Sequence, residues 1–229
     1  MKMISKIIAA LALVSFSLPL AAQDEPQIGF IRLVNAVAAG EGNTSILVDG
    51  EDLYPDGYQL GQRTGGIGLK VGARRVTIRK DGVEEGVTTV DVALGMTTTL
   101  IAFAEKQEPK DEDDPITWKA RILRLKQSDP ERGYRLTVVS VCAEKDVTFT
   151  IATAARRAFE MKTVKRFDTT TVDLGNSRGD VEVRLRETKE VLCGMSLDEP
   201  GNYVAVIYND ADGSIKALTF YDPKFVIAG

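Results

Sequence analysis

Hydrophobic and polar residues alternate along most of the chain, in short runs that are separated by turn residues. Residues 30–35 (FIRLVN) are followed by residues 45–49 (SILVD), and this second run ends at Asp49-Gly50. Residues 74–80 (RRVTIRK) alternate in the same way and end at Asp81-Gly82, a pair that supplies the positive φ angles of a hairpin turn. Helical spacing is rare after residue 22, so the pattern predicts an all-β chain.

Two further strands are predicted at residues 97–105 and 116–125. The first is rich enough in β-branched and apolar residues for the centre of a sheet. In the second, the alternation places Trp118, Ala120 and Ile122 on the inward face.

Residues 152–167 (ATAARRAFEMKTVKRF) are ambiguous. They fit either a short helix or a crossing between sheets with a strand at residues 163–167. The corresponding segment of the first half, residues 51–66, is full of Gly and Pro, which favours the loop-like crossing.

Five strand patterns of the first half recur in the same order in the second half. Leu33 and Val138 occupy matching positions 105 residues apart, and so do Val76 and Val181, whereas Ile46 and Phe149 are 103 residues apart. A sustained offset of this size indicates two copies of one domain. The matches are FIRLVN with RLTVVS, SILVDG with TFTIAT, RRVTI with GDVEV, TTTLIAF with GNYVAVIY, and KARILRL with SIKALTFY.

The boundary between the copies is predicted near residues 127–133, where Pro and Gly interrupt the strand pattern. This gives a first domain at residues 23–129 and a second at 130–229. Each holds about seven short strands with regular turns, which favours two tandem antiparallel β-sandwiches of the immunoglobulin-like class.

The first 22 residues have the layout of a secretory signal peptide. Lys2 and Lys6 precede an apolar run at residues 7–20, and Ala21-Ala22 precede polar Gln23. The apolar run is too short for a membrane anchor. We therefore expect cleavage after Ala22 and no transmembrane anchor. The expected location is the periplasm, with secretion or the cell surface as the alternative.

Composition narrows the range of functions. The chain contains no histidine, which removes the commonest general base and metal ligand and makes a hydrolase or metalloenzyme less expected. The net charge is -4 and the basic residues are scattered, so nucleic acid is not an expected partner. We expect no cofactor and no enzymatic activity, with a carboxylate-based enzyme as a minor alternative.

The acidic segment at residues 105–115 (EKQEPKDEDDP) has two interpretations. Its carboxylates suggest a calcium loop, because hard cations need several oxygen ligands. It lacks the fixed glycine and the ligand spacing of a defined calcium motif, which favours a solvated hairpin loop.

The remaining candidates for chemistry each have a plainer structural interpretation. The glycines at residues 66, 68 and 72 precede a strand where a phosphate loop needs a helix. The arginines fit an anion-binding face or a solvent-facing row, and the exposed tyrosines fit sugar stacking or packing. The residues concerned are Arg32, Arg74, Arg75, Arg79, Arg121 and Arg124; Tyr54, Tyr58, Tyr203, Tyr208 and Tyr221; Ser45, Ser140 and Ser196; and Asp173, Asp180 and Glu182.

Both cysteines, Cys142 and Cys193, lie in the second half. In an exported chain, two cysteines favour a disulfide over a reactive site. We therefore predict a Cys142–Cys193 bridge, with two buried free thiols as the alternative.

The opening stretch resembles a widespread bacterial family of uncharacterised extracytoplasmic β-sandwich domains. The resemblance lies in residues 32–36 (RLVNA) and 46–50 (ILVDG), and in the later strands at residues 72–78 and 97–101. The plan of the whole chain resembles the alginate biosynthesis protein F family. That resemblance implies a periplasmic, non-catalytic protein required for O-acetylation of an exopolysaccharide alongside acyltransferases. No functional residue is carried over from either family.

Two functions are therefore expected. The first is an exported accessory or adaptor protein in exopolysaccharide modification (alginate-type O-acetylation) or export, which contacts a protein such as the acyltransferase machinery, a polysaccharide, or both. The alternative is a general periplasmic or cell-surface β-sandwich module for binding or structure, with no link to acetylation.

Overall fold

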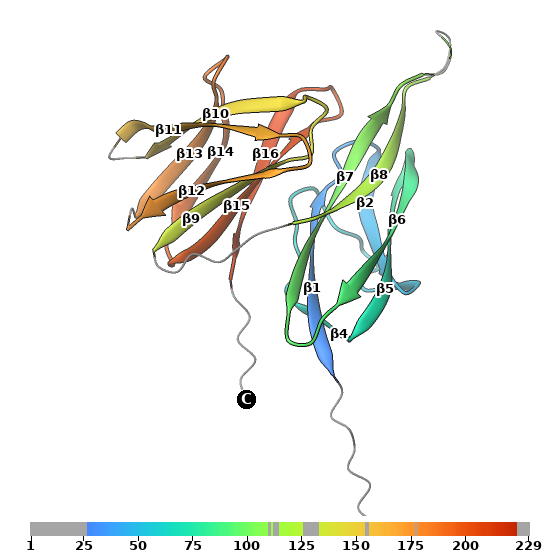
Figure 1. Cartoon of the computed structure of the whole chain (residues 1–229). Helices are drawn as coiled ribbons and strands as arrows, with labels where there is room; N and C mark the ends of the chain where they lie inside the picture. Colours follow the sequence, from blue (N-terminus) through green and yellow to red (C-terminus); the bar gives the residue numbers. More distant parts are fainter. Residues whose placement is uncertain are drawn as a thin grey trace, which may run out of the picture.

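The computed structural model describes residues 27–109, 111, 115–125, 133–153, 156–176 and 178–223. The predicted signal peptide at residues 1–22 lies outside them, as does most of the predicted domain boundary. Within the described residues the chain forms sixteen strands and no helix, which confirms the all-β prediction (Figure 1). The strands are β1 (Ile28–Ala36), β2 (Glu41–Val48), β3 (Glu51–Asp52), β4 (Ile67–Lys70), β5 (Gly72–Asp81), β6 (Val83–Val92), β7 (Thr97–Gln107), β8 (Thr117–Arg124), β9 (Tyr134–Ser140), β10 (Asp146–Thr153), β11 (Arg156–Lys165), β12 (Thr169–Gly175), β13 (Gly179–Leu185), β14 (Val191–Leu197), β15 (Gly201–Asn209) and β16 (Ile215–Asp222). Among the described residues, no helix is long and apolar enough to span a membrane.

Strands β1 to β8, the first half, form one sheet in the order β3-β2-β5-β6-β8-β7-β1-β4. Strand β6 meets β8 at a single paired position, Glu84 with Lys119. Gly86 permits this close approach, because a Cβ atom there would lie 2.3 Å from the carbonyl oxygen of Ala120. The junction divides the sheet into two four-stranded layers, and side chains such as Ile46 and Leu100 from the two layers share one core.

Strands β9 to β16, the second half, form two separate sheets. Their orders are β11-β10-β13-β14 and β12-β9-β15-β16. Phe149 and Val183 from the first sheet and Leu136 and Ala205 from the second belong to one buried cluster. The two sheets therefore pack over a common core.

The same strand order occurs in both halves. The layer β4-β1-β7-β8 corresponds to β12-β9-β15-β16, and β3-β2-β5-β6 corresponds to β11-β10-β13-β14. The pairing register also repeats. Leu33 pairs with Leu100 in the first half, and the residues 105 positions later, Val138 and Ala205, pair with each other in the second half. The offset read from the sequence thus coincides with a repeated pattern of strand pairing.

Most strand pairs are antiparallel, as predicted, but each half also contains a parallel pair that was not predicted. Strand β1 runs parallel to β7, and β9 runs parallel to β15. In each half the first strand lies beside the penultimate strand, and the chain between them passes through the opposite layer. Two adjacent strands joined by such a crossover connection run in the same direction.

The crossing predicted at residues 152–167 contains the expected strand, but that strand starts earlier than residue 163 and is longer. Strand β11 occupies Arg156–Lys165 and pairs antiparallel with β10, from Asp146 with Lys165 to Thr153 with Arg156. The corresponding strand of the first half, β3, has only two residues. The Gly-rich and Pro-rich connection of the first half therefore did not predict the structure of the matching segment in the second half, which forms a ten-residue strand.

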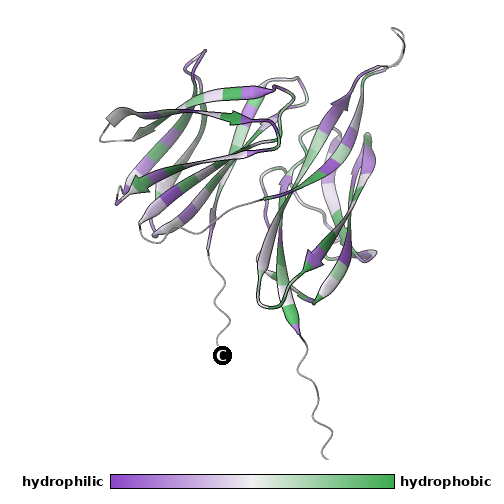
Figure 2. Ribbon diagram, viewed as in Figure 1, coloured by the Kyte–Doolittle hydropathy of each residue, from purple (hydrophilic) through white to green (hydrophobic). Residues whose placement is uncertain are grey.

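Alternate residues of the central strands pack in different cores. Ile31 and Leu33 of β1 lie in the core of the first half, whereas Val34 lies in a third cluster that contains residues of both halves. In β15, Ala205 faces the core of its own half and Val206 the third cluster. Figure 2 shows the hydrophobic bands along the strands of both halves. The shared layer, as we call this third cluster, contains eleven buried residues: Val34, Ala36, Ile101, Phe103, Leu125, Val139, Val141, Val204, Val206, Tyr208 and Phe220.

A buried ion pair joins the halves beside the shared layer. Arg32 of β1 pairs with Asp222 at the end of β16, and their side chains are only 1% and 2% exposed. Burial, followed by the charge of Arg63, lowers the pKa of Arg32 to about 10, so the guanidinium still carries its charge at neutral pH. Each charge would be costly without the other, because a buried ion that loses its partner keeps its full desolvation penalty.

Replacing Asp222 by Asn should destabilise the protein by about 3–5 kcal/mol, because the charge of Arg32 then stays buried without its counterion. Urea unfolding of the purified protein would measure the loss. Asp91→Asn is the matched control, because Asp91 is exposed on β6. Equal unfolding midpoints for the two variants would show that the ion pair contributes nothing.

Candidate functional site

A pocket of about 500 Å³ lies in the connection between β3 and β4. We call it the tyrosine pocket. Two aromatic rings, those of Tyr54 and Tyr58, lie with their centroids 5.3 Å apart and their planes tilted by 50°. The lining residues are Leu53, Tyr54, Tyr58, Gln62, Arg63, Thr64 and Ile67.

The backbone around the tyrosine pocket is bonded to two strands. The side-chain amide of Asn35 on β1 donates to the carbonyl of Tyr58 at 2.9 Å, and the backbone N–H of Asn35 donates to the carbonyl of Gln62 at 2.9 Å. The hydroxyl of Thr64 accepts a hydrogen bond from the N–H of Leu33, also at 2.9 Å. Tyr58 and Thr44 exchange two backbone hydrogen bonds. The connection is long, but these bonds fix its conformation.

The tyrosine pocket combines apolar rings with a positive charge. Tyr54 is 43% exposed, so its ring is open to a ligand. Burial raises the pKa of Tyr58, and the charge of Asp52 and the neighbouring Tyr54 raise it further, so the phenol is neutral at physiological pH. The exposed side chain of Arg63 makes no ion pair within the described residues and is available to an anionic or hydroxyl-rich ligand.

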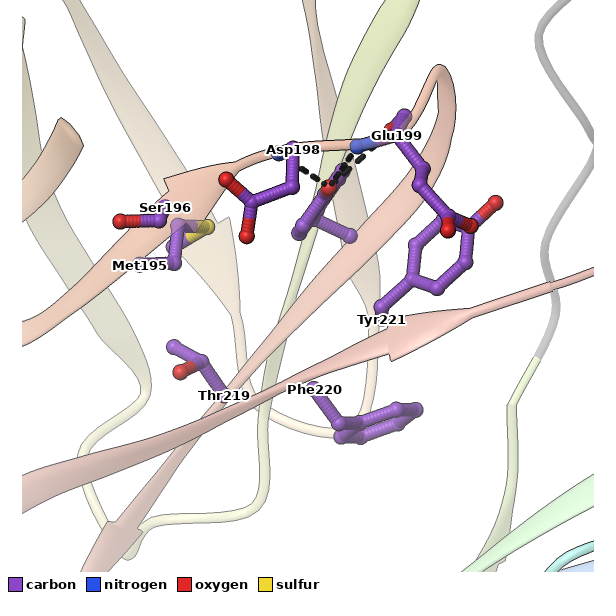
Figure 3. A pocket seen from close by; sticks show the side chains of 8 residues that line it. Met195, Ser196, Asp198, Glu199, Thr219, Phe220 and Tyr221 are labelled. Atoms are coloured by element: carbon purple, nitrogen blue, oxygen red, sulfur yellow. Dashed lines mark hydrogen bonds between the residues drawn. The ribbon is translucent and has the colours of Figure 1, made fainter. Parts of the chain in front are cut away.

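A second pocket, of about 440 Å³, lies between β14, β15 and β16 (Figure 3). Figure 3 shows Asp198 and Glu199 on the turn after β14, with Tyr221 beside Glu199. The Tyr203 hydroxyl accepts hydrogen bonds from the N–H groups of Asp198 and Glu199 at 3.1 and 3.2 Å and donates to the Glu199 carbonyl at 3.0 Å. The Tyr221 hydroxyl donates to the carbonyl of Pro200 at 3.0 Å. Both phenols therefore hold the turn, and the tyrosine pocket is the better ligand site.

The structure separates the tyrosines that the sequence analysis named together. Tyr54 and Tyr58 share the tyrosine pocket, Tyr203 and Tyr221 hold the β14–β15 turn, and Tyr208 lies in the shared layer. Sequence reasoning missed Gln62, Arg63 and Thr64. The available signal was the length of the connection after residue 52, since long connections inside compact folds are usually functional.

The arginines do not form one binding face. Arg32 is buried between the halves, whereas Arg74, Arg79 and Arg121 each pair with a carboxylate on a neighbouring strand or turn. Arg124 donates to the hydroxyl of Thr98. Exposed ion pairs of this kind contribute little stability, but they occupy the guanidinium groups.

The serines and carboxylates named from the sequence do not assemble into one site. Ser196 donates a hydrogen bond to Asp180, and Glu182 pairs with Arg184. Asp173 accepts a hydrogen bond from the N–H of Gly175, and Ser140 bonds to Cys142. The glycine-rich run at residues 65–72 leads into β4 and β5, so no helix N-terminus follows it.

The acidic segment at residues 105–115 is only partly described. Glu105 belongs to β7, and its carboxylate forms ion pairs with Arg121 and Arg166. Burial raises the pKa of Glu105, but the hydrogen bonds and charges of Arg121 and Arg166 together outweigh it and hold the pKa below the ordinary value. Residues 110 and 112–114 lie outside the described residues. Among those described, no group of three or more acidic or cysteine side chains is arranged to hold a metal ion.

Both cysteines are free thiols, in place of the predicted Cys142–Cys193 disulfide. Cys142 follows β9 and bonds to Ser140 at 2.9 Å. Cys193 lies on β14, which contacts the edge strand β16 through Thr219 and Gly194. Strands β9 and β14 belong to opposite sheets of the second half, and both cysteines border the same core.

The comparisons with known proteins identify no family. No protein-family model matches the sequence, and no curated protein matches it. The chain is similar over 80% of its length to the Bacillus anthracis TIE protein, with 12% identity and a TM-score of 0.26, and it spans 34% of that protein. A candidate adhesin (BT2657) from Bacteroides thetaiotaomicron VPI-5482 matches over 87% of this chain and 99% of its own, with 9% identity and a TM-score of 0.20. A candidate adhesin from Bacteroides ovatus matches over 86% and 95%, with 9% identity and a TM-score of 0.18. Scores this low support no argument about this chain.

The unreduced protein should release two reactive thiols per chain when it is unfolded in guanidinium chloride, and react slowly when folded. Burial is the main cause that raises the pKa of Cys142 to about 11 and that of Cys193 to about 12. Both thiol pKa values are raised on folding, so the folded state favours the protonated thiols. Their contribution to the free energy of unfolding is fully present below the unfolded pKa of about 8.5, and it is lost as the pH rises through 11 and 12. A thiol assay with a colorimetric disulfide reagent measures both states. Detection of no thiol in the unfolded, unreduced chain would establish the disulfide instead.

Proposed function

We propose that the protein is a non-catalytic, exported glycan-binding adaptor built from two tandem immunoglobulin-like β-sandwich domains, at residues 23–129 and 130–229. It acts in the periplasm in the modification or export of an exopolysaccharide, beside a protein partner such as the acyltransferase machinery. The tyrosine pocket is the observation that carries this proposal. The link to O-acetylation rests on the resemblance of the chain plan to the alginate biosynthesis protein F family.

The chemistry of the tyrosine pocket suits a sugar. The exposed ring of Tyr54 offers an apolar face for a pyranose, and its hydroxyl offers a polar edge. Arg63 supplies a planar donor fork that fits a carboxylate or vicinal hydroxyls. The hydrogen bonds from β1 and β2 hold the backbone in place before binding, so little conformational entropy is lost when a ligand arrives.

The shared layer supports the adaptor part of the proposal. It fixes the second half relative to the tyrosine pocket, so a protein bound to the second half would meet the glycan at a set distance. The carboxylates Glu105 and Glu182 are engaged by arginines, which favours a structural over a catalytic role for them.

The alternative is a general periplasmic or cell-surface binding or structural module with no link to acetylation. The two functions differ in one consequence. Removal of an acetylation accessory lowers the acetyl content of the exported polymer, whereas removal of a general module leaves that content unchanged.

Replacing Tyr54 by Ala should weaken binding of a soluble acidic polysaccharide, with sodium alginate as the probe, by about tenfold, because truncating an aromatic anchor typically costs more than 1 kcal/mol. Affinity electrophoresis in gels that contain alginate, with dextran gels as the uncharged comparison, measures the change. Leu60→Ala is the control, because Leu60 is exposed to a similar extent, at 42% against 43%, in the same connection but does not line the pocket.

Unchanged migration of the original protein in alginate gels would remove the glycan part of the proposal. Equal losses for the Tyr54→Ala and Leu60→Ala variants would place glycan binding outside the tyrosine pocket.

A further inference from the structure

The second half carries the pocket of about 440 Å³ between β14, β15 and β16 (Figure 3). We call it the acidic pocket, because the carboxylates of Asp198 and Glu199 line it and no Lys or Arg of the described residues does. In Figure 3 both side chains extend from the turn after β14 toward β16, where Thr219 and Tyr221 lie. The walls of the pocket therefore carry negative charge with no cation among them.

Every side-chain hydroxyl of the acidic pocket already donates a hydrogen bond within the protein. The donors and their acceptors are Tyr203 with the Glu199 carbonyl and Tyr221 with the Pro200 carbonyl, both at 3.0 Å, Thr219 with the Gly194 carbonyl at 3.4 Å, and Ser196 with the Asp180 carboxylate. A ligand that needs to accept hydrogen bonds from these hydroxyls therefore finds them engaged.

The two carboxylates of the acidic pocket, in contrast, have unused acceptors. Those of Asp198 and Glu199 form no ion pair and accept no hydrogen bond within the described residues, although their backbone N–H groups are bonded to Tyr203. Arg178 lies beside this turn by strand pairing, since it precedes Gly179, the partner of Leu197, but it pairs with neither carboxylate. The pocket thus matches a ligand that brings donors and a positive charge.

Two tyrosine rings form the apolar wall of the acidic pocket. The centroids of the Tyr203 and Tyr221 rings lie 5.0 Å apart, with their planes tilted by 42°. Gly201 lets the Tyr221 ring pack against the turn, because a Cβ atom there would lie 2.7 Å from a carbon of that ring. Burial, followed by the charge of Glu199, raises the pKa of Tyr221, so the phenol is neutral at physiological pH. A neutral aromatic ring beside a carboxylate attracts a cation.

We propose that the acidic pocket binds a lysine side chain of a protein partner, whose ammonium pairs with Glu199 beside the Tyr221 ring. Asp198 adds a second negative charge. An ammonium group has only donors, and its hydrocarbon stem packs against apolar surface such as the tyrosine rings. The volume lies within the roughly 300–1,000 Å³ of ordinary ligand pockets, so the whole side chain fits.

The same observations disfavour other ligands. An anion would meet the charges of Asp198 and Glu199. A neutral sugar would lose hydrogen bonds, because its hydroxyls also accept and the pocket hydroxyls already donate elsewhere. A metal ion is disfavoured because, among the described residues, no group of three or more acidic or cysteine side chains is arranged to hold one.

The assignment of the lysine to a protein rests on the proposed adaptor function, in which the second half contacts a protein partner. The pocket chemistry itself is separate from glycan binding, because the acidic pocket and the tyrosine pocket share no residue. A loss of alginate binding and a loss of lysine binding are therefore distinguishable.

The test is an NMR titration of the isotopically labelled mature protein with Nα-acetyl-lysine N-methylamide. Two matched ligands are the Nε-acetylated form of this compound, which lacks the charge, and glucosamine, which carries its ammonium group on a sugar ring. We expect saturable shifts of the amide signals of residues 195–203 and 219–221, with a dissociation constant on the order of millimolar. Binding should be at least about tenfold weaker for the uncharged form and about threefold weaker for glucosamine.

Four variants assign the binding to individual groups. Glu199→Gln should weaken it by about fivefold, which is the upper range for an exposed ion pair. Tyr221→Leu should weaken it by about threefold, whereas Tyr221→Phe, which keeps the ring, should stay within about twofold. Glu187→Gln is the control, because Glu187 is an exposed acid of the second half that does not line the pocket, and its affinity should also stay within about twofold.

The proposal fails if the lysine compound shifts none of the pocket signals, or if its Nε-acetylated form binds as tightly. It also fails if both Glu199→Gln and Tyr221→Leu bind as the original protein does. Tighter binding of glucosamine than of the lysine compound would overturn the assignment to a protein and favour an amino-sugar glycan.

Discussion

The structure depends on four central strands, β1, β7, β9 and β15, that are buried on both faces. One face of each strand packs into the core of its own half, and the other face contributes to the shared layer. In β15 this leaves residues 202–208 buried without interruption. Burying a large aliphatic or aromatic side chain stabilises by about 1.5–3 kcal/mol, so even the shared layer alone outweighs the exposed ion pairs of the surface, at about 0–1 kcal/mol each.

One polar pair inside this contact determines its register. The Arg32–Asp222 pair is fully buried and joins β1 of the first half to the end of β16 of the second. Apolar surfaces alone tolerate sliding, whereas a buried charge that slides away from its partner loses several kcal/mol. The shared layer therefore supplies most of the attraction, and the ion pair selects one relative position of the halves. That fixed position holds the tyrosine pocket at a set distance from the second half.

Local patterns predicted the strands well, and long-range packing explains what they missed. Period-two alternation located β5 and β7 within two residues, and the 105-residue offset anticipated the repeated register. The continuous apolar run in YVAVIY is a sign of burial on both faces, but the sequence does not say which surface covers the second face. The disulfide prediction rested on compartment and spacing, and these do not reveal that the strands of the two cysteines, β9 and β14, belong to opposite sheets, where both thiols are free. Tyr54 and Tyr58 of the tyrosine pocket were named from the sequence, whereas Gln62, Arg63 and Thr64 join them only through the folded connection.

The shared layer and the Arg32–Asp222 pair hold the two halves together as one rigid body. Residual dipolar couplings of backbone N–H groups in the isotopically labelled mature protein test it most directly, because they report the orientation of each half relative to a common alignment tensor. A single tensor, of the same magnitude and direction for residues 27–125 and 133–223, is the result that the shared layer and the Arg32–Asp222 pair predict. Two tensors of clearly different magnitude would show that the halves move independently and that the shared layer does not fix their relative position.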